Sequence, residues 1–235
     1  MIAALVALAL APGQFVALDQ VDPTIVQDMR YATRHNFVGR RIHGYREPVC
    51  LLTRQAARAL HRAQNALEPK GYGLKVYDCY RPTRAVAQFD RWARNLADQK
   101  MKAEFYPRTD KRRAFVDGYI AHRSGHSRGS TVDITLVRLP AKAPPAWDGK
   151  LRSCVAPYRR RFRDNSVNMG TTYDCMDPRA HTLHPAITGR AHRNRLLLER
   201  VLTRAGFDAY ANEWWHFTLR NEPYPESYFN FPVSR

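Results

Sequence analysis

The segment TVDITLVRL, residues 131–139, constrains the fold of this chain more than any other. It is rich in β-branched residues, so it predicts a strand in the interior of a sheet. Asp133 lies between Val132 and Ile134 in this run. A carboxylate without a partner is costly to bury in such a strand. We therefore expect Asp133 to face a cation.

The remaining elements alternate along the chain. Apolar and alanine residues recur at helical spacing in three segments, 53–67, 83–99 and 190–206. Two other segments predict strands, 74–80 and 213–219. Thr53 is placed to cap the first helix, and Gly71 lies just past its end. Helices and strands interleave around a few β-rich segments, so we predict an α+β fold.

The cysteines indicate the compartment. Cys50, Cys79, Cys154 and Cys175 are even in number and form no CxxC pair, which favours two disulfides in an oxidising compartment over four free thiols in a cytosolic enzyme. Three pairings are open to four cysteines, and we favour Cys50 with Cys79 and Cys154 with Cys175. The second pair would anchor the segment 140–168, whose prolines and basic run indicate a surface excursion.

The N-terminus and the net charge add weaker constraints. Residues 2–11 are uncharged and apolar, so 1–16 is predicted to be a secretory leader, with a packed N-terminal segment as the alternative. The apolar run 2–11 is too short to span a bilayer. The formal net charge is +17, but its basic residues are dispersed and no nucleic-acid-binding motif accompanies them. We therefore predict an exported, periplasmic protein without a specific nucleic-acid partner; the alternative is the cytoplasm.

Two short motifs contain the residue types of a catalytic zinc site. SGHSRGSTVD supplies His126 and Asp133, and its glycines and serines allow the chain to turn between them. EWWH supplies Glu213 and His216. A catalytic zinc site needs three protein ligands and leaves one position for water. If His216 is the third ligand, Glu213 lies close to the metal and can exchange protons with the attacking water.

A third motif, YDCYRPTRAV, places a guanidinium at the end of a strand. Arg81 precedes a proline that stops this strand. At that position it can stabilise the oxyanion that forms when water attacks an amide carbonyl. The alternative is a structural ion pair of Arg81 with Asp78 or Asp90.

These motifs, together with DMRYATRHNFVG and MGTTYDCMD, resemble the VanX-type D-alanyl-D-alanine dipeptidases, zinc enzymes of the LAS metallopeptidase group. The similarity runs from about residue 22 to residue 232. It implies one domain, 17–235, with a small and mostly antiparallel central sheet flanked by helices and a zinc site at the sheet edge. It also implies one Zn²⁺ per chain, bound by His126, Asp133 and His216, with Glu213 as general base and Arg81 stabilising the transition state.

The resemblance further implies a small D,D-dipeptide as substrate. Asp174 and Ser124 match positions that hold the free amino terminus, and a carboxylate suits an ammonium group because the bond between them is charge-assisted. A site that reads both termini would exclude longer peptides. Such an enzyme would act in peptidoglycan fragment turnover or in glycopeptide resistance, and the predicted export favours turnover. The oligomeric state is not predicted.

Two alternative functions remain open. A LAS-type carboxypeptidase or endopeptidase would act on longer muropeptides and tolerate an acylated amino terminus. A zinc-stabilised cell-wall binding protein would have no turnover, but a structural zinc site is usually closed by four protein ligands. The segment 140–168 is longer than in the shortest family members and leads into Asp174, so this departure from the family concerns the substrate range and not the metal site.

Overall fold

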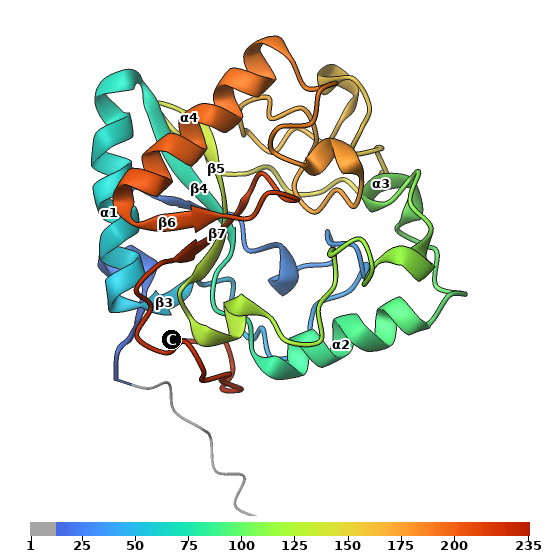
Figure 1. Ribbon diagram of the computed structural model, residues 1–235, viewed down its shortest axis with the longest axis horizontal. Coiled ribbons are helices and arrows are strands. Elements are labelled where there is room, and N and C mark those ends of the chain that lie inside the picture. Colours follow the sequence, from blue (N-terminus) through green and yellow to red (C-terminus); the bar gives the residue numbers. More distant parts are fainter. Residues whose placement is uncertain (1–12) are drawn as a thin grey trace, which may run out of the picture.

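The computed structural model describes residues 13–235. Its centre is a five-stranded sheet in the order β2-β4-β5-β7-β6 (Figure 1). The strands are β2 Val26–Gln27, β4 Tyr72–Asp78, β5 Thr131–Arg138, β6 Phe207–Ala209 and β7 His216–Leu219. β2 pairs with β4 in parallel, and the other pairings are antiparallel. A two-stranded sheet pairs β1 Phe15–Ala17 with β3 Leu51–Thr53. The α+β class and the mostly antiparallel sheet are confirmed.

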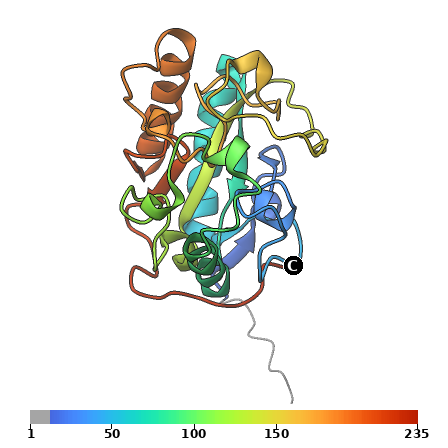
Figure 2. The same ribbon diagram turned by 90° about the vertical axis from the view of Figure 1, so that its right-hand side faces the viewer.

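Two long helices cover one face of the sheet. The helices of the chain are α1 Arg54–Leu67, α2 Thr83–Arg94, α3 Lys102–Phe105 and α4 Gly189–Ala205. α1 and α4 pack against each other and on the sheet, while α2 lies away from it, across the lower part of Figure 1. Figure 2 shows irregular segments on the side of the sheet opposite these two helices.

Alternation along β5 separates the apolar core from the polar site. Val132, Ile134 and Leu136 belong to the buried cluster that includes residues of α1 and α4. Successive side chains of a strand point to opposite faces, so Asp133 points to the other face. Opposite it, a bulge in β4 between Val76 and Asp78 shifts the register, and Asp78 pairs with Asp133. The site therefore lies on the face that the long helices leave free.

Both favoured disulfides are present. Cys50 is bonded to Cys79 and Cys154 to Cys175. The first joins the chain just before β3 to the residue after β4. The second joins the irregular segment 140–168 to the segment that carries Asp174. The second half of the segment 140–168 is not only a surface excursion, because Asp164 is buried there against β4.

Most predicted elements are confirmed, with some changed bounds. Thr53 caps α1 by accepting the backbone N–H of Ala56, and Gly206 ends α4 in the left-handed conformation. α2 ends at Arg94, before the predicted residue 99, because Asn95 leaves the helical conformation. β7 starts three residues later than predicted, and the short strand β6 was not predicted at all.

The structure describes only part of the predicted leader 1–16. Residues 1–12 lie outside the described residues. Phe15 and Val16, which the predicted leader 1–16 includes, belong to β1 and are buried against the fold. A leader that ended at residue 16 would therefore remove most of a paired strand. Among residues 13–235, no helix combines the length and the apolar character needed to cross a bilayer.

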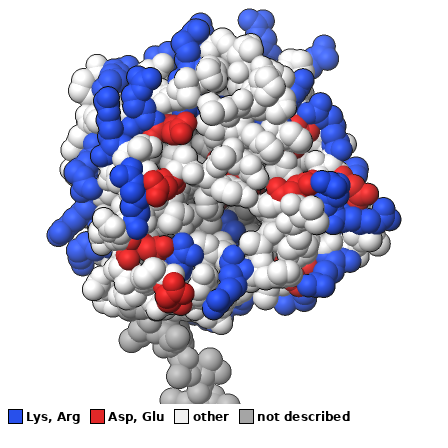
Figure 3. Space-filling model, in the orientation of Figure 1, with Lys and Arg blue, Asp and Glu red and all other residues white. Residues whose placement is uncertain are grey.

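On the face shown in Figure 3, the basic residues do not gather into one patch. Figure 3 shows lysine and arginine side chains around the rim of one face, with uncharged residues over most of its centre. A dispersed distribution supports solubility and weak attraction to polyanions, but it does not form a site for one of them.

Candidate active site

Three polar atoms converge at one end of the sheet. His126 Nε2 lies 3.2 Å from Asp133 Oδ1 and 3.3 Å from His216 Nδ1, and His216 Nδ1 lies 3.1 Å from Asp133 Oδ1. Asp133 and His216 are paired residues of β5 and β7, and His126 lies in the short helix Gly125–Arg128 just before β5. The site predicted at the sheet edge thus lies at one end of the three inner strands β4, β5 and β7, and not along an outer strand.

The spacing of these atoms fits a zinc ion. Ligand atoms about 2.0–2.1 Å from a tetrahedral zinc lie roughly 3.3 Å from one another. His126 Nδ1 lies 2.7 Å from the carbonyl oxygen of Cys79, to which it donates its proton. Its Nε2 then presents a lone pair to the Asp133 carboxylate, an arrangement that a cation between them stabilises. A backbone carbonyl on the second nitrogen is also the usual partner of a histidine that binds metal.

The second oxygen of Asp133 is held away from the other two residues. Tyr173 donates its hydroxyl proton to Oδ2 at 2.9 Å, and Arg81 Nη2 lies 3.4 Å from the same oxygen. Burial favours the neutral acid, but the facing imidazoles of His126 and His216 hold the pKa of Asp133 below its usual range. The carboxylate is therefore ionised and presents Oδ1 alone to the metal position.

Arg81 forms the structural ion pair with Asp78 that was the alternative to a catalytic role, and the catalytic role stays a prediction. Its Nε donates to Asp78 Oδ2 at 2.8 Å, and Asp78 Oδ1 accepts the hydroxyl of Tyr45 at 2.6 Å. Asp90, the other candidate partner, pairs with Arg94 instead. Burial disfavours the charge of Arg81, yet Asp78 holds its pKa well above the usual value, so the guanidinium stays protonated beside Asp133.

Glu213 lies beside the metal position. Its Oε2 is 3.6 Å from His216 Nδ1, and its side chain is 14% exposed. Burial, and then the charges of Asp133 and Asp174, raises the pKa of Glu213 well above its usual value. A carboxyl group that can hold a proton near neutral pH is suited to act as base and then as acid.

A small cavity opens onto these residues. Its volume is about 200 Å³, below the roughly 300 Å³ or more of pockets that bind drug-sized ligands. Six of the seven predicted site residues line it: Arg81, Ser124, Asp133, Asp174, Glu213 and His216. The seventh, His126, is fully buried behind them. The structure thus brings all of the predicted residues together.

Asp174 is a buried acid on the wall of this cavity. It is 8% exposed, and both of its oxygens accept the hydroxyl of Tyr31, at 2.9 and 3.1 Å. Burial, reinforced by the charge of Asp133, raises the pKa of Asp174 to about 8. Among residues 13–235, no basic side chain lies within ion-pair distance of it. A cationic group in the cavity would supply the missing counter-charge.

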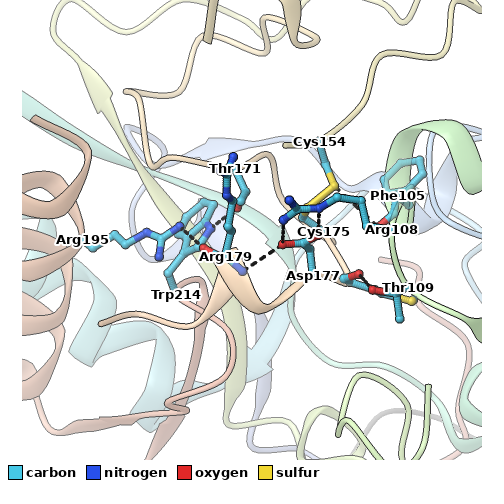
Figure 4. Close-up of a disulfide and its surroundings, with 11 residues drawn as sticks. Phe105, Arg108, Thr109, Cys154, Thr171, Cys175, Asp177, Arg179, Arg195 and Trp214 are labelled. Atoms are coloured by element: carbon cyan, nitrogen blue, oxygen red, sulfur yellow. Dashed lines mark hydrogen bonds and ion pairs between the residues drawn. A yellow bond between two sulfur atoms is a disulfide. The ribbon is translucent and has the colours of Figure 1, made fainter. Parts of the chain in front are cut away.

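The segment around Asp174 is tied down on both sides. Asp174 has a φ of 57°, a left-handed conformation that is uncommon outside glycine. Figure 4 shows the disulfide of Cys175 and, two residues further on, Asp177 accepting two hydrogen bonds from Arg108 at 2.7 and 2.6 Å. On the other side, Trp214 donates its indole N–H to Thr171 at 2.8 Å. These contacts hold the segment of Asp174 in place against Trp214, the residue next to Glu213.

Ser124 has a structural contact as well as a place in the cavity wall. Its Oγ accepts the backbone N–H of His126 at 3.3 Å and lies 3.5 Å from Arg81 Nη1. The hydroxyl therefore caps the short helix that carries His126. A contact with substrate stays a prediction for this residue.

Sequence reasoning missed the residues that hold the site in place. Tyr173 fixes Asp133, Tyr31 fixes Asp174, and Tyr45 fixes Asp78. Tyr173 and Tyr31 lie in two motifs that were singled out, TTYD and DMRY, but only Tyr173 is next to a predicted site residue, Asp174.

Comparison with known proteins agrees with this geometry. A family model described as D-ala-D-ala dipeptidase matches residues 12–144 and 154–234. The chain belongs to this family. The match omits residues 145–153, which lie inside the irregular segment 140–168. The predicted family is therefore confirmed over almost the whole described chain.

Curated members of the family align over most of their own length. The D-alanyl-D-alanine dipeptidase of Streptomyces coelicolor is 38% identical over 222 residues, 94% of this chain and 99% of that protein. The one from Enterococcus faecium is 37% identical, covering 93% and 98% of the two chains. The one from Escherichia coli is 30% identical, covering 88% and 84%.

Proposed function

We propose that this protein is a zinc-dependent dipeptidase that hydrolyses D-alanyl-D-alanine to two D-alanines. One observation carries the proposal: a cavity of about 200 Å³ contains a three-ligand metal position and, on its wall, a buried acid without a basic partner. The metal position provides for amide hydrolysis, and the acid matches a free amino terminus. The family membership and the names of its relatives point to the same substrate.

His126, Asp133 and His216 would hold one Zn²⁺, and their spacing fits it. When bound, the ion supplies Lewis acidity to a water molecule and to the scissile carbonyl. Similar ligand sets accept other divalent ions, but two imidazoles and a carboxylate suit zinc well. The three residues leave the cavity side of the position free for water and substrate.

The remaining residues would act on the substrate. Glu213 accepts the proton that the attacking water loses and returns it to the nitrogen of the departing D-alanine. Arg81, held by Asp78, stabilises the negative charge that develops on the carbonyl oxygen. Asp174 binds the ammonium group of the first D-alanine through a charge-assisted hydrogen bond.

Export is part of this proposal. The two disulfides are consistent with an oxidising compartment. In that compartment the enzyme would act on dipeptides released from the cell wall, so turnover of peptidoglycan fragments suits it better than glycopeptide resistance. Finding the protein in the cytosol with reduced thiols would contradict this role.

The proposal is tested by D-alanine release from free D-Ala-D-Ala, measured beside the N-acetylated dipeptide. We expect the zinc-loaded protein to cleave only the free dipeptide, because the acetyl group removes the charge that Asp174 binds. Glu213→Ala should lower the rate by about 10²–10⁴-fold while keeping its zinc. Equal cleavage of the acetylated dipeptide would favour a peptidase for longer muropeptides. Zinc-loaded protein without any turnover would favour a cell-wall binding protein.

A further inference from the structure

The charges that line the active-site cavity are not all paired with one another. Arg81 pairs with Asp78 and Asp133, and His216 faces Asp133. Of the other two lining acids, Glu213 lies 3.6 Å from His216, and Asp174 has no basic partner in residues 13–235. Arg123 is the lining base that has no acidic partner within ion-pair distance in the same described range. The wall of the cavity thus offers one carboxyl group and one guanidinium group that are not paired with each other or with another charged side chain of the described residues.

Arg123 lies where the cavity meets a second one. The neighbouring cavity, of about 490 Å³, shares Val86, Arg123 and Ser124 with the active-site cavity. The guanidinium carbon of Arg123 is 4.4 Å from the centre of the Tyr228 ring, which lines the second cavity. This contact orients the guanidinium without using its hydrogen-bond donors. The residue is exposed, so it makes no contribution to the core.

We infer that Arg123 binds the terminal carboxylate of the substrate and so makes the enzyme specific for dipeptides with a free carboxyl end. The inference rests on the proposed function. A free dipeptide carries one ammonium and one carboxylate group, which complement the unpaired Asp174 and Arg123. The paired Arg81 remains available for the carbonyl oxygen. A guanidinium also matches a carboxylate with two parallel hydrogen bonds.

The test compares D-Ala-D-Ala with its C-terminal amide. The amide keeps the ammonium and the scissile bond but has no carboxylate. Arg123→Gln should lower kcat/KM for the free acid by about 10–100-fold, the value of one hydrogen-bonded charge, mainly through KM. Its rate on the amide should stay within about threefold of the wild type. The preference of the enzyme for acid over amide should therefore disappear in this variant.

Arg91→Gln is the matched control. Arg91 lines the second cavity but not the active-site cavity. This variant removes the same charge and should keep the wild-type preference for the acid. Equal losses on acid and amide in Arg123→Gln, or no loss on either, would overturn the inference. An equal loss of preference in Arg91→Gln would reduce the effect to general electrostatics and would also overturn it.

Binding separates this inference from the proposed function. Calorimetry on zinc-loaded Glu213→Ala measures the affinity for acid and amide without turnover. If the wild type releases no D-alanine, the proposed function fails. Tighter binding of the acid that depends on Arg123 would still support the carboxylate site. Equal affinity for acid and amide would reject it.

Discussion

Two buried aspartates, Asp133 and Asp164, lie on the same side of the sheet. Each accepts a hydrogen bond from a tyrosine, but different groups balance their negative charges. The rings of Tyr77 and Tyr173 stack at 4.3 Å with an angle of 6° between their planes. Tyr173 donates to Asp133 at 2.9 Å, and Tyr77 donates to Asp164 at 2.5 Å. Asp164 is also 3.0 Å from both Lys75 Nζ and Arg30 Nη2. Asp133 instead has two imidazoles at close range and one more distant arginine.

The difference distinguishes a structural carboxylate from the carboxylate that we propose as a metal ligand. Burial favours the neutral form of both acids. Lys75 and Arg30 hold the pKa of Asp164 below its usual range. The partners of Asp133 are imidazoles, and burial lowers the pKa of His216, which opposes the positive charge that would balance Asp133. The charges around Asp164 are balanced within the protein, whereas we propose that a bound cation balances the charge of Asp133.

Replacing each aspartate by asparagine tests this contrast, and the largest effect is expected at Asp133. Asp133→Asn should lose D-alanine release by roughly 10³-fold or more, because the Lewis acid contributes several kcal/mol. The zinc content after gel filtration should fall with it. Asp164→Asn should retain zinc and most of the activity of its folded fraction. Zinc retained at wild-type affinity by Asp133→Asn would show that the metal lies elsewhere.

When stability is measured instead of activity, Asp164→Asn should have a larger effect than Asp133→Asn. Asp164→Asn leaves Lys75 and Arg30 buried without full compensation, so it should lower the free energy of unfolding by about 3 kcal/mol. Metal-free Asp133→Asn should change much less, because Arg81 keeps its pair with Asp78. Urea unfolding in the presence of a chelator measures both. A larger loss in metal-free Asp133→Asn would contradict the comparison.

The two stacked tyrosines allow a smaller and more selective test. Tyr173→Phe should weaken zinc binding by about 10–100-fold, the usual cost of losing a partner of a metal ligand. Tyr77→Phe keeps the ring stack and removes only the bond to Asp164, so its zinc affinity should match the wild type. Competition with a chromophoric chelator gives both affinities. Equal weakening in the two variants would assign the effect to the stack instead of the Tyr173 hydroxyl.

Asp174 adds a pH dependence to the stability of the metal-free protein, with a small change from one pH unit to the next. Its pKa of about 8 in the folded protein lies above the value of roughly 3.9 in the unfolded chain, so the folded state binds more protons. Stability of the metal-free protein should therefore fall as pH rises through that window, by up to about 1.4 kcal/mol per pH unit from this group. Asp174→Asn should flatten the curve. Parallel curves for wild type and variant would show that Asp174 is ionised throughout.

The sequence predicts what is local and misses what depends on contacts between distant segments. Thr53 and Gly206 mark helix ends because capping needs only neighbouring residues. His126, Asp133, Glu213 and His216 lie in short motifs, and the fold brings these motifs together as the resemblance implied.

The supporting contacts depend on tertiary structure. Tyr173 reaches Asp133 from 40 residues away, and Tyr31 reaches Asp174 from 143. The buried role of Asp164 was missed because its segment has no periodicity, and its cations come from the two other segments that contain Arg30 and Lys75. The bulge that aligns Asp78 with Asp133 also depends on pairing with β5. No pattern within one segment contains this information.

The central claim is that one zinc ion on His126, Asp133 and His216 makes this cavity a dipeptidase. The most direct test is a zinc titration of the chelator-treated protein, with D-alanine release from D-Ala-D-Ala measured at each step. The account predicts no release from the metal-free protein and activity that rises linearly and stops at one zinc per chain. Full activity without zinc, or one tightly bound zinc without any release, would contradict it.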